Sequence, residues 1–134
     1  MTMDHETPDT LLYTPEHEWL RRDEEHPDEA VIGITDFAQD QVGDVVYLDL
    51  PAPGDQVTAG ERCGEIESAK TVSDFYSPVG GEVVAANGEL EERPELVNES
   101  PYDEGWIIRV RIADETELEG LLDAAGYRAQ LPEN

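Results

Sequence analysis

Apolar and polar residues alternate along several short stretches of this chain, and alternation with a period of two is typical of half-buried β-strands. The clearest case runs from Trp106 to Ile112, where every second residue is apolar. These apolar side chains, Trp106 included, are predicted to face inward, whereas Arg109 and Arg111 face outward. This stretch therefore predicts a strand with one face against a core.

A second strand is predicted at 46–50, with Val46, Leu48 and Leu50 sharing one face. Proline, glycine and asparagine interrupt the apolar runs about every ten residues, which is the spacing of a small sandwich or barrel. The chain is therefore predicted to be mostly β. Four shorter runs predict further strands, at 30–34, 62–67, 72–77 and 82–86.

Two stretches have the apolar spacing of helices instead. Thr35 can cap a short helix near 35–42, because a threonine hydroxyl accepts a hydrogen bond from the first helical turn. Asp114 and Glu117 match a capping box before leucines and an alanine at helical spacing, so a C-terminal helix is predicted near 114–125.

The length of 134 residues fits one domain, expected at 11–130, between flexible tails at 1–10 and 131–134. The formal net charge is −25, with 33 acidic residues against 8 lysines and arginines. Such a field repels nucleic acid and anionic membranes, so neither is an expected partner. A folded domain with so acidic a surface is typical of salt-adapted organisms, where high salt screens the self-repulsion.

Several kinds of site are excluded by residue type. Cys63 is the single cysteine and the chain has three histidines, which give no cluster with the spacing of metal ligands. The first residues lack the features of a signal peptide, and no apolar run is long enough to cross a membrane. A soluble, cytoplasmic protein is therefore expected.

Lys70 is the only lysine of the chain, and it lies in the polar, turn-like segment 67–71. Arginine cannot replace a lysine that is kept for an acylatable amine. The nearby acids Glu65, Glu67 and Asp74 favour the ammonium form, which argues against a catalytic Schiff-base lysine. The hypothesis is that Lys70 is presented outward for another enzyme to modify.

The residues from Tyr13 to about Arg128 resemble the H proteins of the glycine cleavage system. Each matching stretch is moderately specific, and their common order is very specific. The stretches are 13–19, 32–40, 43–46, 67–74, 76–83, 97–102 and 105–106.

The resemblance implies a lipoyl/biotinyl-type barrel-sandwich hybrid fold with the lysine at a hairpin tip. Lys70 matches the lysine that carries lipoate in amide linkage, in a carrier that is not itself an enzyme. A lipoate ligase or an octanoyl/lipoyl transferase would attach the group. The family's partners are the pyridoxal-phosphate-dependent P protein, the aminomethyltransferase or T protein, and the dihydrolipoyl dehydrogenase or L protein.

The resemblance also implies a cleft that shields the loaded arm. Glu18 matches a glutamate lining that cleft and would hold the amine of the cargo, while Asp74 matches an acid that would guide docking. Glu67 is a further recognition candidate. Gln41 stands where many relatives carry histidine, and its amide could still form a hydrogen bond with the arm.

Other carriers remain alternatives. Biotin domains typically have methionine on both sides of the lysine, where this chain has Ala69 and Thr71. A lipoyl domain of a 2-oxo-acid dehydrogenase would usually have aspartate before the lysine. Two further alternatives are an H-like protein that serves only lipoate relay and an acidic interaction module that is not modified. The second would show no mass change on Lys70.

Overall fold

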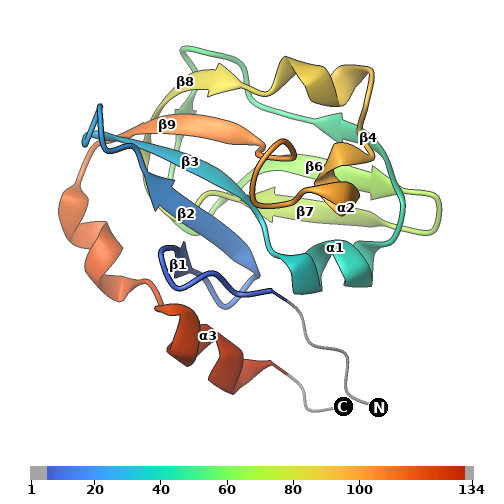
Figure 1. The fold of residues 1–134 in the computed structure, drawn as a ribbon. Helices are drawn as coiled ribbons and strands as arrows, with labels where there is room; N and C mark the ends of the chain where they lie inside the picture. The colour runs from blue at the N-terminus through green and yellow to red at the C-terminus, as the bar shows by residue number, and fades with distance from the viewer. Residues whose placement is uncertain (1–5, 132–134) are drawn as a thin grey trace.

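Two antiparallel sheets enclose the core of the protein in the computed structural model, which describes residues 6–131 (Figure 1). The larger sheet has the order β1-β2-β3-β9-β8-β5, and the smaller has the order β4-β6-β7. The mostly β prediction is thus confirmed. The larger sheet comprises β1 (Leu12–Tyr13), β2 (Glu18–Arg22), β3 (Glu29–Ile34), β9 (Ile108–Ile112), β8 (Gly81–Ala86) and β5 (Gln56–Val57); the smaller comprises β4 (Val45–Asp49), β6 (Arg62–Ser68) and β7 (Val72–Tyr76).

The main core contains inward-facing side chains from both sheets. Ile66 and Phe75 of the smaller sheet and Val83 and Ile108 of the larger one are almost completely buried. Each such side chain contributes roughly 1.5–3 kcal/mol when it is removed from water. The four shorter predicted strands correspond to β3, β6, β7 and β8, and β3 is buried from Ala30 to Ile34 without alternation.

The strand predicted at 46–50 has a different inner face from the one expected. The pairing of β4 with β6 shifts register between Val45 and Tyr47, which is a β-bulge. Val45 is buried as a result, whereas Val46 is 55% exposed. The expectation that Val46 shares a buried face with Leu48 was wrong, because a bulge interrupts the period of two.

The strand predicted from Trp106 begins two residues later, at Ile108. Ile107 and Ile108 are both fully buried, and Trp106 is only half-buried. The outward positions of Arg109 and Arg111 agree with the prediction, since Arg109 is half-buried and Arg111 is exposed.

The short helix near 35–42 is confirmed as α1 (Asp36–Val42), and the Thr35 hydroxyl accepts a hydrogen bond from the Ala38 amide. Phe37 and Val42 are its buried residues. Two further short segments lie between β8 and β9: the 3-10 helix η1 (Gly88–Glu91) and the helix α2 (Leu96–Glu99).

The continuous helix predicted near 114–125 is wrong. The chain forms a 3-10 helix, η2 (Glu115–Gly120), and then a separate helix, α3 (Ala124–Gln130). The Glu117 carboxylate accepts a hydrogen bond from the Gly80 amide at 2.9 Å instead of closing a capping box. Leu122 exchanges two backbone hydrogen bonds with Tyr13, both at 2.8 Å. These long-range bonds hold the chain extended where the helix was expected to continue.

A second apolar cluster joins α3 to the first strands, and Figure 1 shows α3 beside β1. The rings of Tyr13 and Tyr127 stack with their centroids 4.7 Å apart. Leu131 packs against this cluster, whereas the rest of the predicted tail 131–134 lies outside the described residues.

The N-terminal tail predicted at 1–10 is described only from Glu6. The Glu6 amide donates to Asp36, and Arg128 of α3 contacts Thr7 and Asp9. The part of the tail within the described range is therefore held against the domain.

Candidate functional site

Lys70 lies in the turn that joins β6 to β7, and the Ser68 side chain braces that turn. The Ser68 hydroxyl accepts hydrogen bonds from the amides of Lys70, at 3.2 Å, and Thr71, at 3.0 Å. The Ser68 amide donates to the Thr71 carbonyl at 2.8 Å, and the Ala69 amide donates to the Asp44 carbonyl at 3.2 Å. Hydroxyl and backbone bonds thus fix a tight turn that contains no glycine.

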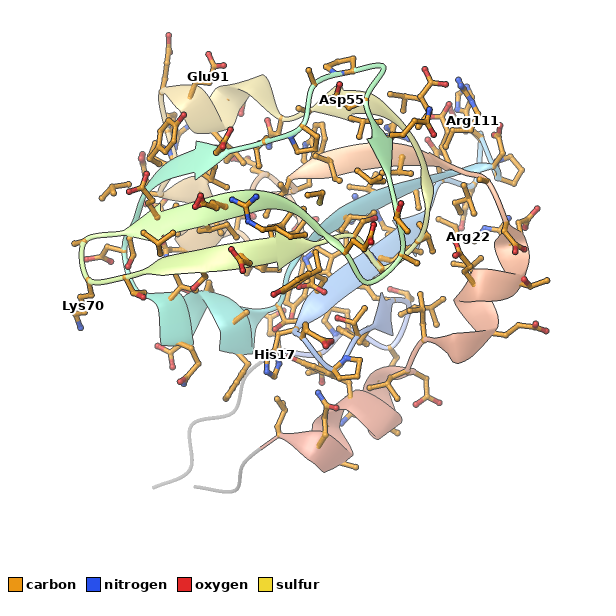
Figure 2. All side chains as sticks on the ribbon, turned by 180° about the vertical axis from the view of Figure 1, so that it is seen from behind. His17, Arg22, Asp55, Lys70, Glu91 and Arg111 are labelled. Carbon is orange, nitrogen blue, oxygen red and sulfur yellow. The ribbon has the colours of Figure 1, made fainter. Side chains whose placement is uncertain are left out.

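The Lys70 side chain is exposed and points away from the protein at the outer end of the hairpin (Figure 2). Its ammonium forms no hydrogen bond or ion pair with any of residues 6–131. The backbone of the lysine is therefore fixed while its amine stays available to another molecule.

The outer face of the smaller sheet carries a row of acids near this turn. The register places Asp49 opposite Glu65, and Glu65 opposite Asp74. Arg62 crosses the row and forms ion pairs with Glu65 at 2.8 Å and with Asp74 at 2.9 Å. The predicted recognition residue Asp74 is exposed, and its carboxylate is oriented by Arg62.

Glu67 lies in the adjacent row, one pair closer to the turn. It is opposite Tyr47 of β4 and Val72 of β7, so the three side chains share the outer face. Glu67 is half-buried between them. The structure thus brings Glu67 and Asp74 together on one surface beside Lys70.

Glu18, at the start of β2, is in a very different environment. Its residue is 3% exposed, and its carboxyl group accepts a hydrogen bond from the Thr14 hydroxyl at 2.7 Å. Burial raises its pKa to about 8, and the neighbouring Glu16 carboxylate adds to the shift. Bonds from the Thr14 hydroxyl and the Tyr76 amide oppose that shift. The Glu18 carboxyl group thus has the Tyr76 amide of β7, an edge strand of the smaller sheet, as a neighbour.

Lys70 and Glu18 are not in contact. Glu18 reaches β7 at Tyr76, whereas the Lys70 turn precedes Val72 at the opposite end of the same strand. At about 3.3 Å per residue, the strand separates its two ends by roughly 13 Å. A group that connects the two positions must therefore extend along β7.

Gln41 is exposed near the end of α1. The chain continues from α1 to Asp44, whose carbonyl accepts the hydrogen bond from Ala69 in the turn. Gln41 is thus on the element that adjoins the Lys70 turn, and its amide faces solvent.

Thr14 and His17 lie next to Glu18, in space or in the chain, although the sequence did not identify them as site residues. His17 has a φ of 74°, which is rare for a residue other than glycine. Its Nδ1 atom lies 2.7 Å from the Tyr127 hydroxyl, and burial lowers its pKa. In the sequence, the polar residues Thr14 and Glu18 stand four residues apart around a turn, and this spacing could have indicated that Thr14 bonds to Glu18.

Other chemistry finds no support within the described residues. Burial raises the pKa of the Cys63 thiol to about 12, which makes it a poor nucleophile. Residues 6–131 contain no group of three or more histidine, cysteine, aspartate or glutamate side chains suited to a metal ion. In that same range, none of the helices has the length and apolar character needed to span a membrane.

Comparisons with known proteins agree with this arrangement. The family model described as glycine cleavage H-protein matches residues 11–134. The glycine cleavage system H protein of Listeria monocytogenes is 53% identical over 124 residues, which are 92% of this chain and 97% of that protein. The one from Micrococcus luteus is 53% identical over 120 residues, 90% of this chain and 93% of that protein.

A solved structure extends the agreement to the fold. The crystal structure of a glycine cleavage system H protein from Mycobacterium marinum superimposes with a TM-score of 0.83 at 37% identity, and covers 92% of this chain and 97% of that one. From the matched family model, the identity over most of the chain and the shared fold, we conclude that this chain belongs to the glycine cleavage H-protein family.

Proposed function

We propose that this protein is the lipoyl carrier of a glycine cleavage system, a cytoplasmic subunit without catalytic residues of its own. The observation that carries the proposal is the single lysine of the chain, exposed on a turn that Ser68 holds in place. Membership of the H-protein family supports the same assignment.

The Lys70 turn fits a covalently attached lipoyl group. Attachment needs an accessible amine with no competing partner, and the Lys70 ammonium has none among residues 6–131. The resulting amide removes one positive charge, so the formal net charge would change from −25 to −26. When attached, lipoate supplies a sulfur that carries the aminomethyl group derived from glycine.

The proposed partners are the P, T and L proteins and the enzyme that lipoylates Lys70. An exposed turn is suited to visiting several active sites in succession, because the amine projects beyond the body of the domain (Figure 2). The acidic row that contains Asp74 would favour partner surfaces rich in arginine and lysine. Glu67 and Asp74 are our candidates for this recognition.

Glu18 is our candidate for holding the amine of the cargo. With a pKa of about 8, its carboxyl group is mostly protonated at neutral pH. A nearby ammonium group stabilises the carboxylate and lowers that pKa, so binding would release a proton. Gln41, on the element that adjoins the turn, would form a hydrogen bond with the arm.

Reconstitution tests the proposal directly. Lipoylated protein, mixed with P, T and L proteins, glycine, tetrahydrofolate and NAD, should support NADH formation, and the unmodified protein should not. A chain that accepts lipoate on Lys70 yet gives no NADH would instead indicate the lipoate-relay function.

The acidity of the chain is proposed to be an adaptation to salt. A net charge of −25 on 134 residues causes self-repulsion that salt screens. The free energy of unfolding should therefore rise strongly from low to molar KCl. An unchanged stability over that range would contradict the adaptation.

A further inference from the structure

Three large apolar side chains lie exposed beside the Lys70 turn. Val46 is 55% exposed, Tyr47 56% and Val72 54%, and within residues 6–131 no other large apolar side chain is exposed. Exposed apolar side chains that gather in one place mark interaction sites more often than scattered ones do. Their position next to the only lysine of the chain suggests an interaction surface beside Lys70.

The backbone creates this patch in two ways. The bulge in β4 turns the consecutive residues Val46 and Tyr47 to the outer face, where a regular strand would bury one of them. The register across β6 then aligns Tyr47 with Val72 on the same face, with Glu67 between them. We call Val46, Tyr47 and Val72 the apolar patch.

The patch continues toward a hollow at the edge of β4. Tyr47 is one of the residues lining a cavity of about 340 Å³ between β4 and η1. Leu50, Pro51 and Leu90 are among its apolar walls. An apolar side chain of a partner could enter there next to the Tyr47 ring.

Acids border the patch on the side away from the turn. Glu67 lies between Tyr47 and Val72, and Asp49, Glu65 and Asp74 form the next row of the sheet. The Arg62 guanidinium forms ion pairs with Glu65 and Asp74 of this row. The complementary surface is therefore apolar at its centre and basic at its rim.

We propose that the apolar patch is the docking surface for the enzyme that acylates Lys70, an inference that rests on the proposed carrier function. That enzyme must bring an activated acyl group to the lysine amine, so it must cover the turn and the residues next to it. An enzyme acting on the far end of a long attached arm has no such need. The position of the patch therefore favours the acylating enzyme.

The reaction at this surface would be an ordinary amide formation. The Lys70 amine, after losing its proton to solvent, attacks the acyl carbon of a lipoyl adenylate. A nitrogen–carbon bond forms, the bond from that carbon to the phosphate oxygen breaks, and AMP leaves as the nitrogen gives up a second proton to solvent.

The test measures acylation of the full-length protein by a lipoate–protein ligase supplied with lipoate and ATP. Tyr47→Ser and Val72→Ser should each lower kcat/KM for the protein substrate by about tenfold, mainly through a higher KM, as for central residues of an interface. Tyr47→Phe keeps the apolar ring and should behave like the unaltered protein. Val84→Ser, at a half-buried valine of β8 in the other sheet, is the control of the same residue type.

The outcomes separate this inference from the carrier function. Lipoylation of the unaltered protein at Lys70 supports the carrier function, whatever the variants do. Equal kcat/KM for the unaltered protein, Tyr47→Ser and Val72→Ser would overturn the docking surface. A loss shared by Val84→Ser would also overturn it, since the effect would then not be local. Circular dichroism of each variant confirms that it has folded.

Discussion

The Lys70 turn and the buried Glu18 lie at the two ends of β7, and the protein surrounds the two ionisable side chains in opposite ways. Lys70 is exposed. Its backbone is fixed by hydrogen bonds within the turn 68–71 and by the bond from the turn to the Asp44 carbonyl. Glu18 is 3% exposed and is held by Thr14 and by the edge of another sheet. The first group faces solvent, and the second is enclosed by the protein.

The comparison shows that exposure decides what each group can do. An exposed amine on a braced turn can enter the active site of another enzyme. A desolvated carboxyl group with a pKa of about 8 can change its protonation state near neutral pH when a cation approaches. In the function proposed above, the exposed site would deliver the cargo and the buried site would shelter it.

The largest effect is expected from Lys70→Arg. This variant keeps the charge and, because the side chain forms no hydrogen bond or ion pair with any of residues 6–131, should have an unchanged melting temperature. It should nevertheless give no glycine–bicarbonate exchange with a cognate P protein after treatment with ligase. If the variant supported as much glycine–bicarbonate exchange as the unaltered protein, Lys70 would not be the carrier site.

Glu18→Gln should change how stability depends on pH. The folded-state pKa of Glu18, about 8, lies above the ordinary value of 4.5, so the folded protein favours the protonated form. The unaltered protein should therefore lose stability relative to the variant as pH rises from about 4.5 to 8, by up to about 5 kcal/mol. Urea unfolding of both proteins at a series of pH values measures this difference.

Two features of that difference are diagnostic. It should be smallest below pH 4.5 and constant above pH 8, because both states then share one protonation state. A flat difference for Glu18→Gln would mean that the carboxyl group is not desolvated.

Ser68→Ala should have a moderate effect that stays at the turn. It removes the hydroxyl that accepts from two amides, and should cost about 0.5–1.5 kcal/mol of unfolding free energy. Hydrogen exchange at the Thr71 amide should accelerate, and exchange at Tyr76 should not. Ser68→Thr keeps the hydroxyl and serves as control; equal acceleration at both amides would show that the two ends of β7 are coupled.

Asp74→Asn should have the smallest effect on stability, below that of Ser68→Ala. It weakens an ion pair with Arg62 that is exposed on both sides, and such pairs contribute little to folding. Its effect should instead appear as a higher KM for ligase at low salt that disappears at high salt. A change in KM that did not depend on salt would indicate that Asp74 contacts the ligase through an interaction that is not electrostatic.

Sequence patterns predicted the parts of this structure that depend on neighbouring residues. The Thr35 cap of α1 is set by a bond within a few residues, and most bonds of the tight turn at Lys70 are equally local, so their motifs were sufficient. The strands β3, β6, β7 and β8 were predicted from short runs of sequence between proline, glycine and asparagine residues. The predicted helix near 114–125 failed because Glu117 and Leu122 bond to distant chain segments.

The same distinction applies to the site. Lys70 and the acids around it stand out in the sequence, whereas the burial of Glu18 depends on where β2 meets the Tyr76 amide of β7. The bulge that exposes Val46 and Tyr47 is likewise a property of strand pairing, and the period of the sequence predicted the opposite face for Val46. Contacts between distant segments decide both features.

The most direct test of the central claim is the mass of the protein after expression with lipoate and a lipoate–protein ligase. We predict an increase of one lipoyl group in the intact mass, with peptide mapping that places it on Lys70. An unshifted mass under saturating ligase, with a known H protein modified in the same reaction, would contradict the account.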